Sequence, residues 1–249
     1  MLSDITPIIL TFNEQDNIER TLSALSWAKD VVVIDSFSTD STLTICSKFE
    51  NVRVIQNKFE NFAQQCNFAL SQTFQTQWVL SMDADYVVTP ELANSFSTLT
   101  PEQTTNGYEI GFEYLINGQA LRGSLYPPRV SLYRKAQAHY HQDGHAHRVQ
   151  VAGNVLSLKE KFQHDDRKPY ERWLASQKKY AAQEAEKLSA STWKQLSWPD
   201  RMRFLAIAPI IMLPYTLFIK GLVLNGLPGI EYARQRLIAE IELQKARFK

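Results

Sequence analysis

The chain has few cysteines, and the two present, Cys46 and Cys66, do not stand in a metal-binding or redox spacing. This scarcity excludes a disulfide framework and favours a reducing compartment. The first four residues carry no basic charge and the apolar run after them is short, so no secretory signal is predicted and we expect a cytoplasmic protein. The sequence also lacks internal repeats and low-complexity segments.

An excess of charge of either sign is missing as well. The 249 residues include 27 basic and 26 acidic side chains, which gives a formal net charge of +1. This balance provides no electrostatic attraction to nucleic acid, so no nucleic-acid partner is expected. A hydrophobic fraction of 44% and an aromatic fraction of 11% are enough for one large domain, alone or with a substantial appendage.

Residues 1–90 follow the alternating pattern of a doubly wound α/β fold. The run at 31–34 is β-branched without alternation, which is typical of a strand buried on both faces of a parallel sheet. Asn13 or Asp16 is expected to cap the first helix, which carries Ile18, Leu22 and Leu25 at helical spacing. The other expected elements are strands at 5–10, 52–55 and 78–80 and helices at 42–49 and 61–73.

Two carboxylates, Asp83 and Asp85, follow the fourth expected strand. A D-x-D spacing points both side chains to one side of an extended segment, where they can bind a divalent cation through oxygen. The alternative is a polar strand end whose aspartates cap a turn. Residues 11–14 and Asp35 also fall at the carboxyl ends of expected strands, where open α/β sheets bind ligands, and this favours the binding interpretation.

After residue 89 the pattern changes. Strands are expected at 108–115 and 130–133, a hairpin at 149–151 and 155–158, and a long helix at 169–188. The apolar stretch 204–224 approaches the length of a membrane span, but Pro209, Pro214 and Lys220 interrupt it. A kinked segment at the membrane surface is favoured over a span, and core-packing or dimerising helices, with a possible homo-oligomer, are the alternative.

Four of the five histidines lie within 139–147, where they permit either a zinc site or an acceptor-binding loop. The fifth, His164, precedes two aspartates and Arg167. His164 is a candidate to complete the coordination of a cation at Asp85, and the planar fork of Arg167 suits a phosphate.

Several segments resemble family 2 glycosyltransferases, which have the GT-A fold. They are PIILTFNEQDNIERTLSAL, VVVIDSFSTDST, FAQQCNFAL and WVLSMDADYVVTPEL. The stretch QDGHAHRVQVAGNVLSLKEKFQHDDRKPYERWLASQKKYAAQEAEKL resembles the bacterial branch that builds the lipopolysaccharide inner core, with β-1,4-glucosyltransferases the nearest likeness. The resemblance implies an α/β GT-A mixed sheet with a helical C-terminal extension.

The resemblance also implies site roles. Asp85 would bind Mg²⁺ or Mn²⁺ bridging a diphosphate, with Asp83 contacting the ribose or the metal, and Asp35 would pair with uracil, so that a UDP donor is implied. Residues that would contact the nucleotide-sugar are Thr11, Phe12, Glu14, Asp35, Gln64, Asn67, Asp83 and Arg167.

Inversion at the anomeric carbon needs a general base on the acceptor side. Many relatives have a His-Glu pair where this chain has His147-Arg148, and an arginine cannot serve as a base. Asp143 is therefore the expected base, with His145 and His147 as alternative bases or acceptor contacts; the alternative for Asp143 is a turn aspartate before Gly144.

The expected organisation is a catalytic domain at 1–168, with a nucleotide-binding half at 1–90 and an acceptor half at 91–168, and a helical region at 169–249 associated with the membrane surface. The expected function is transfer of a sugar, with glucose as the best guess, from a UDP-sugar to a lipid-linked glycan such as the lipopolysaccharide core, at the inner face of the cytoplasmic membrane. The alternative is a non-catalytic nucleotide-sugar-binding protein. A nucleotidyltransferase is disfavoured because residues 11–14 contain no glycine-rich basic loop.

Overall fold

The computed structural model describes residues 1–72, 75–143 and 146–248, and the side chains of 143, 146 and 147 also lie outside the description. It forms two compact units. Unit 1 comprises Met1–Glu113, Tyr126–Gln142 and Ala146–Arg167, and unit 2 comprises mainly Tyr114–Leu125 and the chain from Lys168 onward. The change of unit after Arg167 lies one residue from the boundary expected at 168, but Tyr114–Leu125 groups with the C-terminal part of the chain. The assignment of functional halves stays a prediction.

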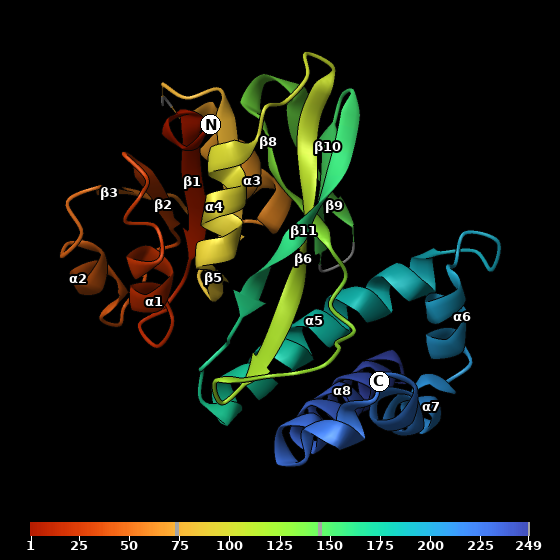
Figure 1. Cartoon of the computed structure of the whole chain (residues 1–249). Coiled ribbons are helices and arrows are strands. Elements are labelled where there is room, and N and C mark those ends of the chain that lie inside the picture. Colours follow the sequence, from red (N-terminus) through yellow and green to blue (C-terminus); the bar gives the residue numbers. More distant parts are fainter. Residues whose placement is uncertain (73–74, 144–145, 249) are drawn as a thin grey trace. The chain divides into compact units, whose positions relative to one another are not determined.

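Unit 1 begins with the expected alternation of strands and helices (Figure 1). Its first half contains η1 (Leu2–Asp4), β1 (Ile5–Thr11), α1 (Ile18–Ser23), β2 (Val31–Asp35), α2 (Thr42–Cys46), β3 (Val52–Gln56), α3 (Phe62–Ser71), β4 (Trp78–Asp83), β5 (Tyr86–Val88) and α4 (Pro90–Thr98). The remaining elements are β6 (Thr105–Ile116), which continues into unit 2, β8 (Arg129–Arg134), η2 (Lys135–Gln137), β9 (Ala138–Asp143), β10 (Ala146–Val151) and β11 (Asn154–His164).

The main sheet is mixed, as expected. Its strand order is β3-β2-β1-β4-β8-β6-β11-β5, with β1, β2, β3 and β4 paired in parallel and β8 antiparallel to both β4 and β6. The short strand β5 pairs antiparallel with β11 at the far edge. A β4-to-β5 turn therefore carries the D-x-D motif from the middle of the sheet to its edge.

Both faces of the parallel part are covered by helices, which explains the unbroken apolar run of β2. Val31 and Val33 face a core with α1, α2 and α4, whereas Val32 and Ile34 face a core with α3. All four side chains are fully buried. Successive side chains of β2 point into two different apolar layers. The strand therefore has none of the polar positions that a strand with one solvent-exposed face would have.

Two local expectations were wrong. Helix α1 begins after Asn17, which makes no side-chain cap bond, and neither Asn13 nor Asp16 occupies the cap position. The hairpin across 152–154 also fails as a pair, because β10 pairs with β9 while β11 joins the main sheet. Strand β11 finds partners on the long edge of β6, which sequence patterning around a turn cannot reveal.

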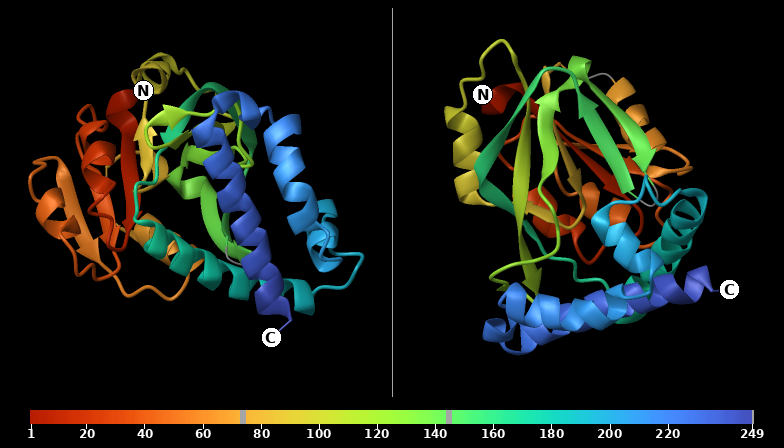
Figure 2. Two further views of the ribbon diagram at one scale, coloured as in Figure 1. Left: turned by 90° about the horizontal axis from the view of Figure 1, so that it is seen from below. Right: turned by 90° about the vertical axis from the view of Figure 1, so that its right-hand side faces the viewer.

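Unit 2 is helical apart from β7 (Gln119–Ala120), which pairs with the end of β6. Its long helices α5 (Tyr170–Ala190) and α8 (Leu227–Arg247) pack against each other through Ala181, Ala185 and Leu243 (Figure 2). The expected helix at 169–188 is thus confirmed within two residues. The chain between the two long helices forms α6 (Trp198–Phe204), α7 (Ala208–Pro214), the π-helix η3 (Tyr215–Ile219) and the 3₁₀ helix η4 (Leu222–Asn225).

The apolar stretch at 204–224 is divided among these short helices. Ala206 and Gly221 adopt positive φ angles of 58° and 70° and interrupt the helical path. Within the described residues, every helix is too short or too polar to cross a bilayer.

Candidate functional site

Three strand ends meet at one edge of the sheet in unit 1. In the β1–β2 register Thr11 lies opposite Asp35, and in the β1–β4 register Leu10 lies opposite Asp83. The polar residues that follow β1, β2 and β4 are therefore neighbours in space, as the sequence predicted. The carboxyl edge of parallel strands is where open α/β folds bind their ligands.

Asp35 is fully buried at this edge and accepts several hydrogen bonds. Its Oδ2 accepts from the Ser38 backbone N–H at 2.9 Å and from Gln56 Nε2 at 3.2 Å, and its Oδ1 accepts from Ser38 Oγ at 2.5 Å and Thr11 Oγ1 at 3.3 Å. Such a set of donors stabilises an ionised carboxylate away from water. Asp35 thus organises the end of β2 in addition to any role toward a ligand.

The loops after β1 and β2 are fastened to each other. The Asn13 N–H donates to Ser38 Oγ at 2.7 Å, and Asn13 Oδ1 accepts from the Thr39 N–H at 2.7 Å. The Glu14 N–H donates to Thr42 Oγ1 at 2.7 Å. Asn13 makes these bonds from a left-handed backbone with φ 56°, which asparagine tolerates better than most residues.

Two aromatic side chains project from these loops. Phe12 is 53% exposed and Phe37 is 52% exposed. Phe37 has φ 62°, an uncommon backbone conformation for a bulky residue that costs about 1–3 kcal/mol. Phe12 was predicted from the sequence, whereas Phe37 was missed because its backbone conformation leaves no trace in the residue pattern.

The D-x-D carboxylates have different surroundings. Asp83 ends β4, and its Oδ2 lies 3.7 Å from Arg129 Nη1. Asp85 is only 8% exposed, and its Oδ2 lies 3.7 Å from His164 Nε2, so the predicted pair of Asp85 and His164 is brought together. Carboxylate oxygens are the ligands that Mg²⁺ and Mn²⁺ prefer, and a neutral imidazole nitrogen is a common ligand of transition-metal ions, of which Mn²⁺ is one.

These side chains fit a cation that takes its remaining ligands from a substrate. In the described part of the chain, no group of three or more His, Cys, Asp or Glu side chains is placed to hold a metal by itself. Divalent cations at phosphate sites commonly use one or two carboxylates together with phosphate oxygens and water. The donor set of Asp85 and His164, with Asp83 beside it, matches that incomplete arrangement.

An aromatic cluster surrounds His164. The rings of Tyr126, Tyr86 and Phe112 lie 4.8, 5.4 and 6.4 Å from its imidazole, measured between centroids. Burial raises the pKa of the Tyr86 and Tyr126 phenols, whose oxygens lie 2.5 Å apart. Tyr86, Tyr126 and Arg129 were not identified from the sequence, because their partners lie about forty or more residues away in the chain.

Arg167 is held by its neighbour Asp165. Arg167 Nε and Nη2 donate to Asp165 Oδ2 at 2.8 and 2.7 Å, and the side chain of Arg167 stays about half exposed. Arg20 Nη2 donates to the Asp165 carbonyl at 2.6 Å, and burial lowers the pKa of Arg20. The Asp165 N–H bonds the Asp85 carbonyl at 3.1 Å, so this network is attached directly to the D-x-D turn.

The two predicted residues of α3 differ in their placement. Gln64 is exposed in the first turn, where its N–H is capped by Asn61 Oδ1 at 2.9 Å. Asn67 uses its amide to pair with the Tyr140 backbone, donating to the carbonyl and accepting from the N–H at 2.9 Å each. Gln65, which the sequence did not single out, is the α3 side chain that reaches the strand ends, donating to Ser36 Oγ at 3.1 Å.

The acceptor-side predictions fall outside the described part of the structure. This applies to His145 and to the side chains of Asp143 and His147, so their roles stay predictions. The zinc alternative for the histidine segment involves the same undescribed residues.

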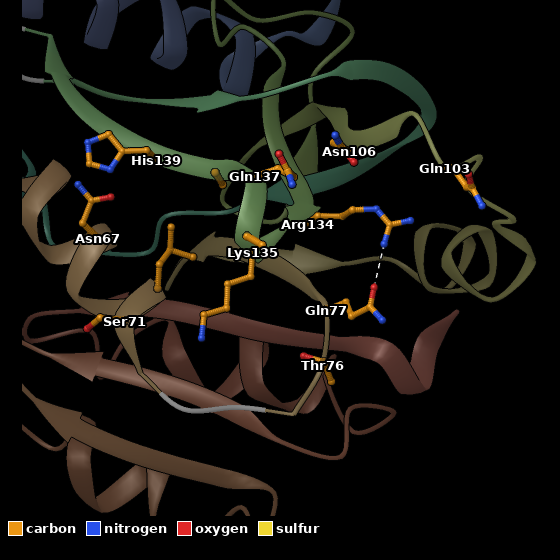
Figure 3. Close-up of a pocket in the computed structure, with 13 residues that line it drawn as sticks. Asn67, Ser71, Thr76, Gln77, Gln103, Asn106, Arg134, Lys135, Gln137 and His139 are labelled. Atoms are coloured by element: carbon orange, nitrogen blue, oxygen red, sulfur yellow. Dashed lines mark hydrogen bonds between the residues drawn. The ribbon is translucent and has the colours of Figure 1, made fainter.

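A separate groove lies elsewhere in unit 1. It has a volume of about 910 Å³ and lies beside the start of β4, at Thr76 and Gln77, whereas Asp83 is at the end of that strand (Figure 3). Arg134 and Gln77 both line this groove, and Arg134 Nη1 donates to Gln77 Oε1 at 2.9 Å. The carboxylates and the histidine converge at the carboxyl edge of the sheet, and this groove is separate from that edge.

Comparison with known proteins finds a family similar to the N-terminal part. Residues 6–97 match the family model described as glycosyl transferase family 2. An uncharacterized glycosyltransferase of Rickettsia bellii is 30% identical over 105 residues, which are 42% of this chain and 35% of the relative. The lipopolysaccharide core biosynthesis glycosyltransferase LpsC of Rhizobium meliloti is 26% identical over 110 residues, covering 43% of this chain and 39% of LpsC. The chain thus spans little more than a third of the length of these relatives.

Solved structures share the fold. TarS of S. aureus superimposes with a TM-score of 0.50 at 18% identity, covering 98% of this chain and 90% of the TarS structure. Glucosyl-3-phosphoglycerate synthase of Mycobacterium tuberculosis gives a TM-score of 0.50 at 14% identity, covering 77% of this chain and 82% of that structure. Together with the mixed sheet and the strand-end motifs, these matches show that the chain has the GT-A fold, and residues 6–97 are similar to glycosyl transferase family 2.

Proposed function

We propose that this protein is an inverting glycosyltransferase that moves a sugar from a UDP-sugar donor to a glycan acceptor. The observation that carries the proposal is the meeting of Thr11, Asp35 and Asp83 at one sheet edge, with Asp85 and His164 next to them. This edge combines hydrogen-bonding groups for a nucleoside, exposed aromatic surface, and ligands for a divalent cation.

The donor nucleotide is assigned to the loops after β1 and β2. Thr11, Phe12, Glu14 and Asp35 are proposed to receive the base and ribose, with Asp35 bonding the uracil ring. The exposed ring of Phe12 offers a surface on which a base can stack. Gln64 and Asn67 are proposed as nearby contacts, although the amide of Asn67 is already paired with Tyr140.

The diphosphate is assigned to the D-x-D side. A bound Mg²⁺ or Mn²⁺ would neutralise negative charge on the departing UDP. Asp85 and His164 would hold that cation, with Asp83 contributing to the metal or the ribose. Arg167, whose side chain is oriented by Asp165 and about half exposed, would bind phosphate oxygens.

The acceptor side is assigned to the end of β9 and the residues that follow it. Asp143 is proposed to take the proton from the acceptor hydroxyl as that oxygen bonds the anomeric carbon. The bond from the anomeric carbon to the diphosphate oxygen breaks at the same time, and its electron pair leaves with UDP. His145 and His147 are the alternative bases or acceptor contacts.

Glucose is the proposed sugar, on the resemblance to lipopolysaccharide core glucosyltransferases. A lipid-linked glycan is the proposed acceptor. The similarity to LpsC, a lipopolysaccharide core biosynthesis glycosyltransferase, supports an acceptor of the lipopolysaccharide core. The reaction would take place at the inner face of the cytoplasmic membrane.

Binding and turnover with a panel of UDP-sugars test the proposal. We expect one UDP-sugar to raise the melting temperature in the presence of Mn²⁺ and to yield UDP with the acceptor. Asp85→Ala should abolish both effects, and Asp143→Asn should remove transfer while leaving UDP binding intact. Asp30→Ala, at a half-buried residue beyond the opposite end of β2, is the control.

Each result separates the candidates. Retained turnover in Asp85→Ala would overturn the metal assignment, and retained turnover in Asp143→Asn would move the base elsewhere. Donor binding without turnover across acceptor extracts would favour the non-catalytic binding protein.

A membrane surface is the proposed location of the acceptor and of unit 2. Large apolar side chains are exposed on α7, on η3 and at the start of α8, among them Ile210 at 76%, Phe218 at 68% and Leu227 at 82%. Isolated exposed apolar residues are ordinary, but a concentration of them on short helices that cannot span a bilayer suits insertion at its interface.

Co-sedimentation with vesicles of phosphatidylglycerol and phosphatidylethanolamine tests this location. The full chain should pellet with the vesicles, and the combined variant Ile210→Ser, Phe218→Ser and Leu227→Ser should not. A variant with Val155→Ser and Leu156→Ser in unit 1 is the control for lost exposed apolar surface. Unchanged pelleting of the triple variant would show that these side chains do not bind the membrane. A protein that is dimeric unchanged and monomeric as the triple variant would show that they serve self-association instead.

A further inference from the structure

Arg129 brings a fixed positive charge to one half of the D-x-D motif. It begins β8, and its side chain is one-third exposed. Its Nη1 lies 3.7 Å from Asp83 Oδ2 and donates to Tyr86 Oη at 3.4 Å, and its guanidinium carbon lies 5.0 Å from the centre of the Tyr126 ring. Three contacts from different directions therefore define the position of the guanidinium.

The same contacts continue to the other half of the motif. Tyr126 shares a short hydrogen bond with Tyr86, and its ring lies against His164 at 4.8 Å. His164 Nε2 in turn lies 3.7 Å from Asp85 Oδ2. The chain of contacts leads from Asp83 through Arg129, Tyr126 and His164 to Asp85, with a cation at one end and an imidazole at the other.

This difference matters for a divalent cation. A guanidinium and a metal ion repel each other, so a carboxylate that already pairs with arginine attracts the metal less strongly. A neutral imidazole has the opposite effect, because its nitrogen lone pair is itself a metal ligand. An arginine side chain is not deprotonated in proteins, so Arg129 keeps its charge at every working pH.

We propose that Arg129 is a positioning residue that divides the D-x-D motif into two tasks. By pairing with Asp83 it directs the divalent cation toward Asp85 and His164, and it fixes the Asp83 carboxylate for contact with the donor. This inference rests on the proposed function, since it assigns the parts played by residues of the same site.

Direct measurement of Mn²⁺ binding in the presence of UDP distinguishes this role from simple structural support. In Arg129→Gln the competing charge is gone, so Mn²⁺ should bind about threefold to tenfold more tightly, the change expected for one partly exposed charge pair. Turnover should nevertheless fall by roughly tenfold or more, with the KM for the donor changed much less, because Asp83 is no longer fixed. Loss of packing alone would weaken Mn²⁺ binding.

Arg134→Gln is the matched control. Arg134 lies at the other end of the same strand and also stacks on an aromatic ring, with its guanidinium carbon 4.7 Å from the Trp78 ring centre. It should leave Mn²⁺ affinity within about twofold of the unchanged protein, since it is remote from the D-x-D turn. Titration calorimetry and the electron paramagnetic resonance signal of free Mn²⁺ both report the affinity without turnover.

The outcomes are separable. If the unchanged protein takes up no Mn²⁺ with UDP, the proposed function fails. If it does, and Arg129→Gln binds Mn²⁺ as the Arg134→Gln control does or more weakly, this inference is overturned while the function stands. Should Arg129→Gln fail to fold, Arg129→Lys provides the test. It keeps the charge, so Mn²⁺ affinity should stay near that of the unchanged protein while turnover falls, and tighter Mn²⁺ binding in it would contradict the proposal.

Discussion

Replacement of Asp35 by asparagine should destabilise unit 1 even before any ligand is considered. The carboxylate is fully buried and accepts from Ser38 N–H, Ser38 Oγ, Thr11 Oγ1 and Gln56 Nε2. An asparagine presents an oxygen to only one pair of these donors and an NH₂ group to the other. The less costly orientation turns the NH₂ group to the two hydroxyls, because a hydroxyl can rotate to accept.

The magnitude follows from the two bonds that remain. Hydrogen bonds to a charged acceptor contribute about 1.5–3 kcal/mol each, and those to a neutral one about 1 kcal/mol. Neutralisation of the acceptor for Ser38 N–H and Gln56 Nε2 therefore removes about 1–4 kcal/mol in total, and we expect a loss near 2–3 kcal/mol. The half-buried pair of Asp30 and Arg53, at 3.0 Å, supplies the comparison at the start of the same strand. Asp30→Asn should cost less than about 1 kcal/mol.

Hydrogen exchange during urea titration provides the measurement, because peptides from β1 and β2 report unit 1 by itself. UDP affinity is measured on the same samples under conditions where both variants are folded. A destabilisation of Asp35→Asn no larger than that of Asp30→Asn would refute the structural role derived from the four donors. A structural loss without any loss of UDP affinity would instead remove Asp35 from the nucleotide contacts.

Three further predictions concern stability and reactivity. Arg203→Met should destabilise unit 2 by about 3–5 kcal/mol in chemical denaturation, because it leaves the buried Glu240 carboxylate without the guanidinium that now donates to it at 2.9 and 3.0 Å. Arg234→Met, at an exposed pair, should change stability far less, and equal effects would contradict this reasoning. Burial raises the pKa of Cys46 from 9.0 to about 11, so at pH 8 its reactive thiolate is about a hundredfold scarcer than in the unfolded chain. Iodoacetamide should therefore label Cys46 only after denaturation. Labelling of the native protein at the rate of the unfolded chain would show that the thiol is not buried. Gly229→Ala should lower the melting temperature of unit 2, since an added Cβ would lie 1.9 Å from the Leu222 carbonyl oxygen, and an unchanged melting curve would show that α8 starts differently.

Local composition was sufficient to predict the elements that carry the site. The unbroken run of Val32 and its neighbours predicted a strand covered on both faces, and helices do lie on both faces of it. The position of Asp83 at a strand end was predicted from the apolar residues before it. The sheet order explains the turn that follows, which leads from β4 to β5 at the edge. Such features depend on residues that are close in the chain, so the sequence contains them.

Features that depend on distant pairing were missed. Arg129 meets Asp83 only because β8 lies beside β4, and Tyr126 meets His164 only because β11 crosses to the far side of β6. The expectation that Asn13 caps α1 failed for a similar reason, because its side chain bonds the loop after β2 instead. Capping rules describe one helix at a time and do not include competition from a neighbouring loop.

The mutual fastening of the loops after β1 and β2 has a thermodynamic consequence. Asn13, Ser38 and Thr39 hold both loops in place through bonds within the protein, so the conformational entropy of ordering them is lost when the chain folds and not when a ligand arrives. A pre-organised site of this kind should bind its ligand with little change in backbone protection. Relaxation of the fastening by Asn13→Ala, which removes the side-chain oxygen that accepts from the Thr39 N–H, would transfer the entropic penalty to the binding step, and affinity would fall although Asn13 itself need not touch the ligand.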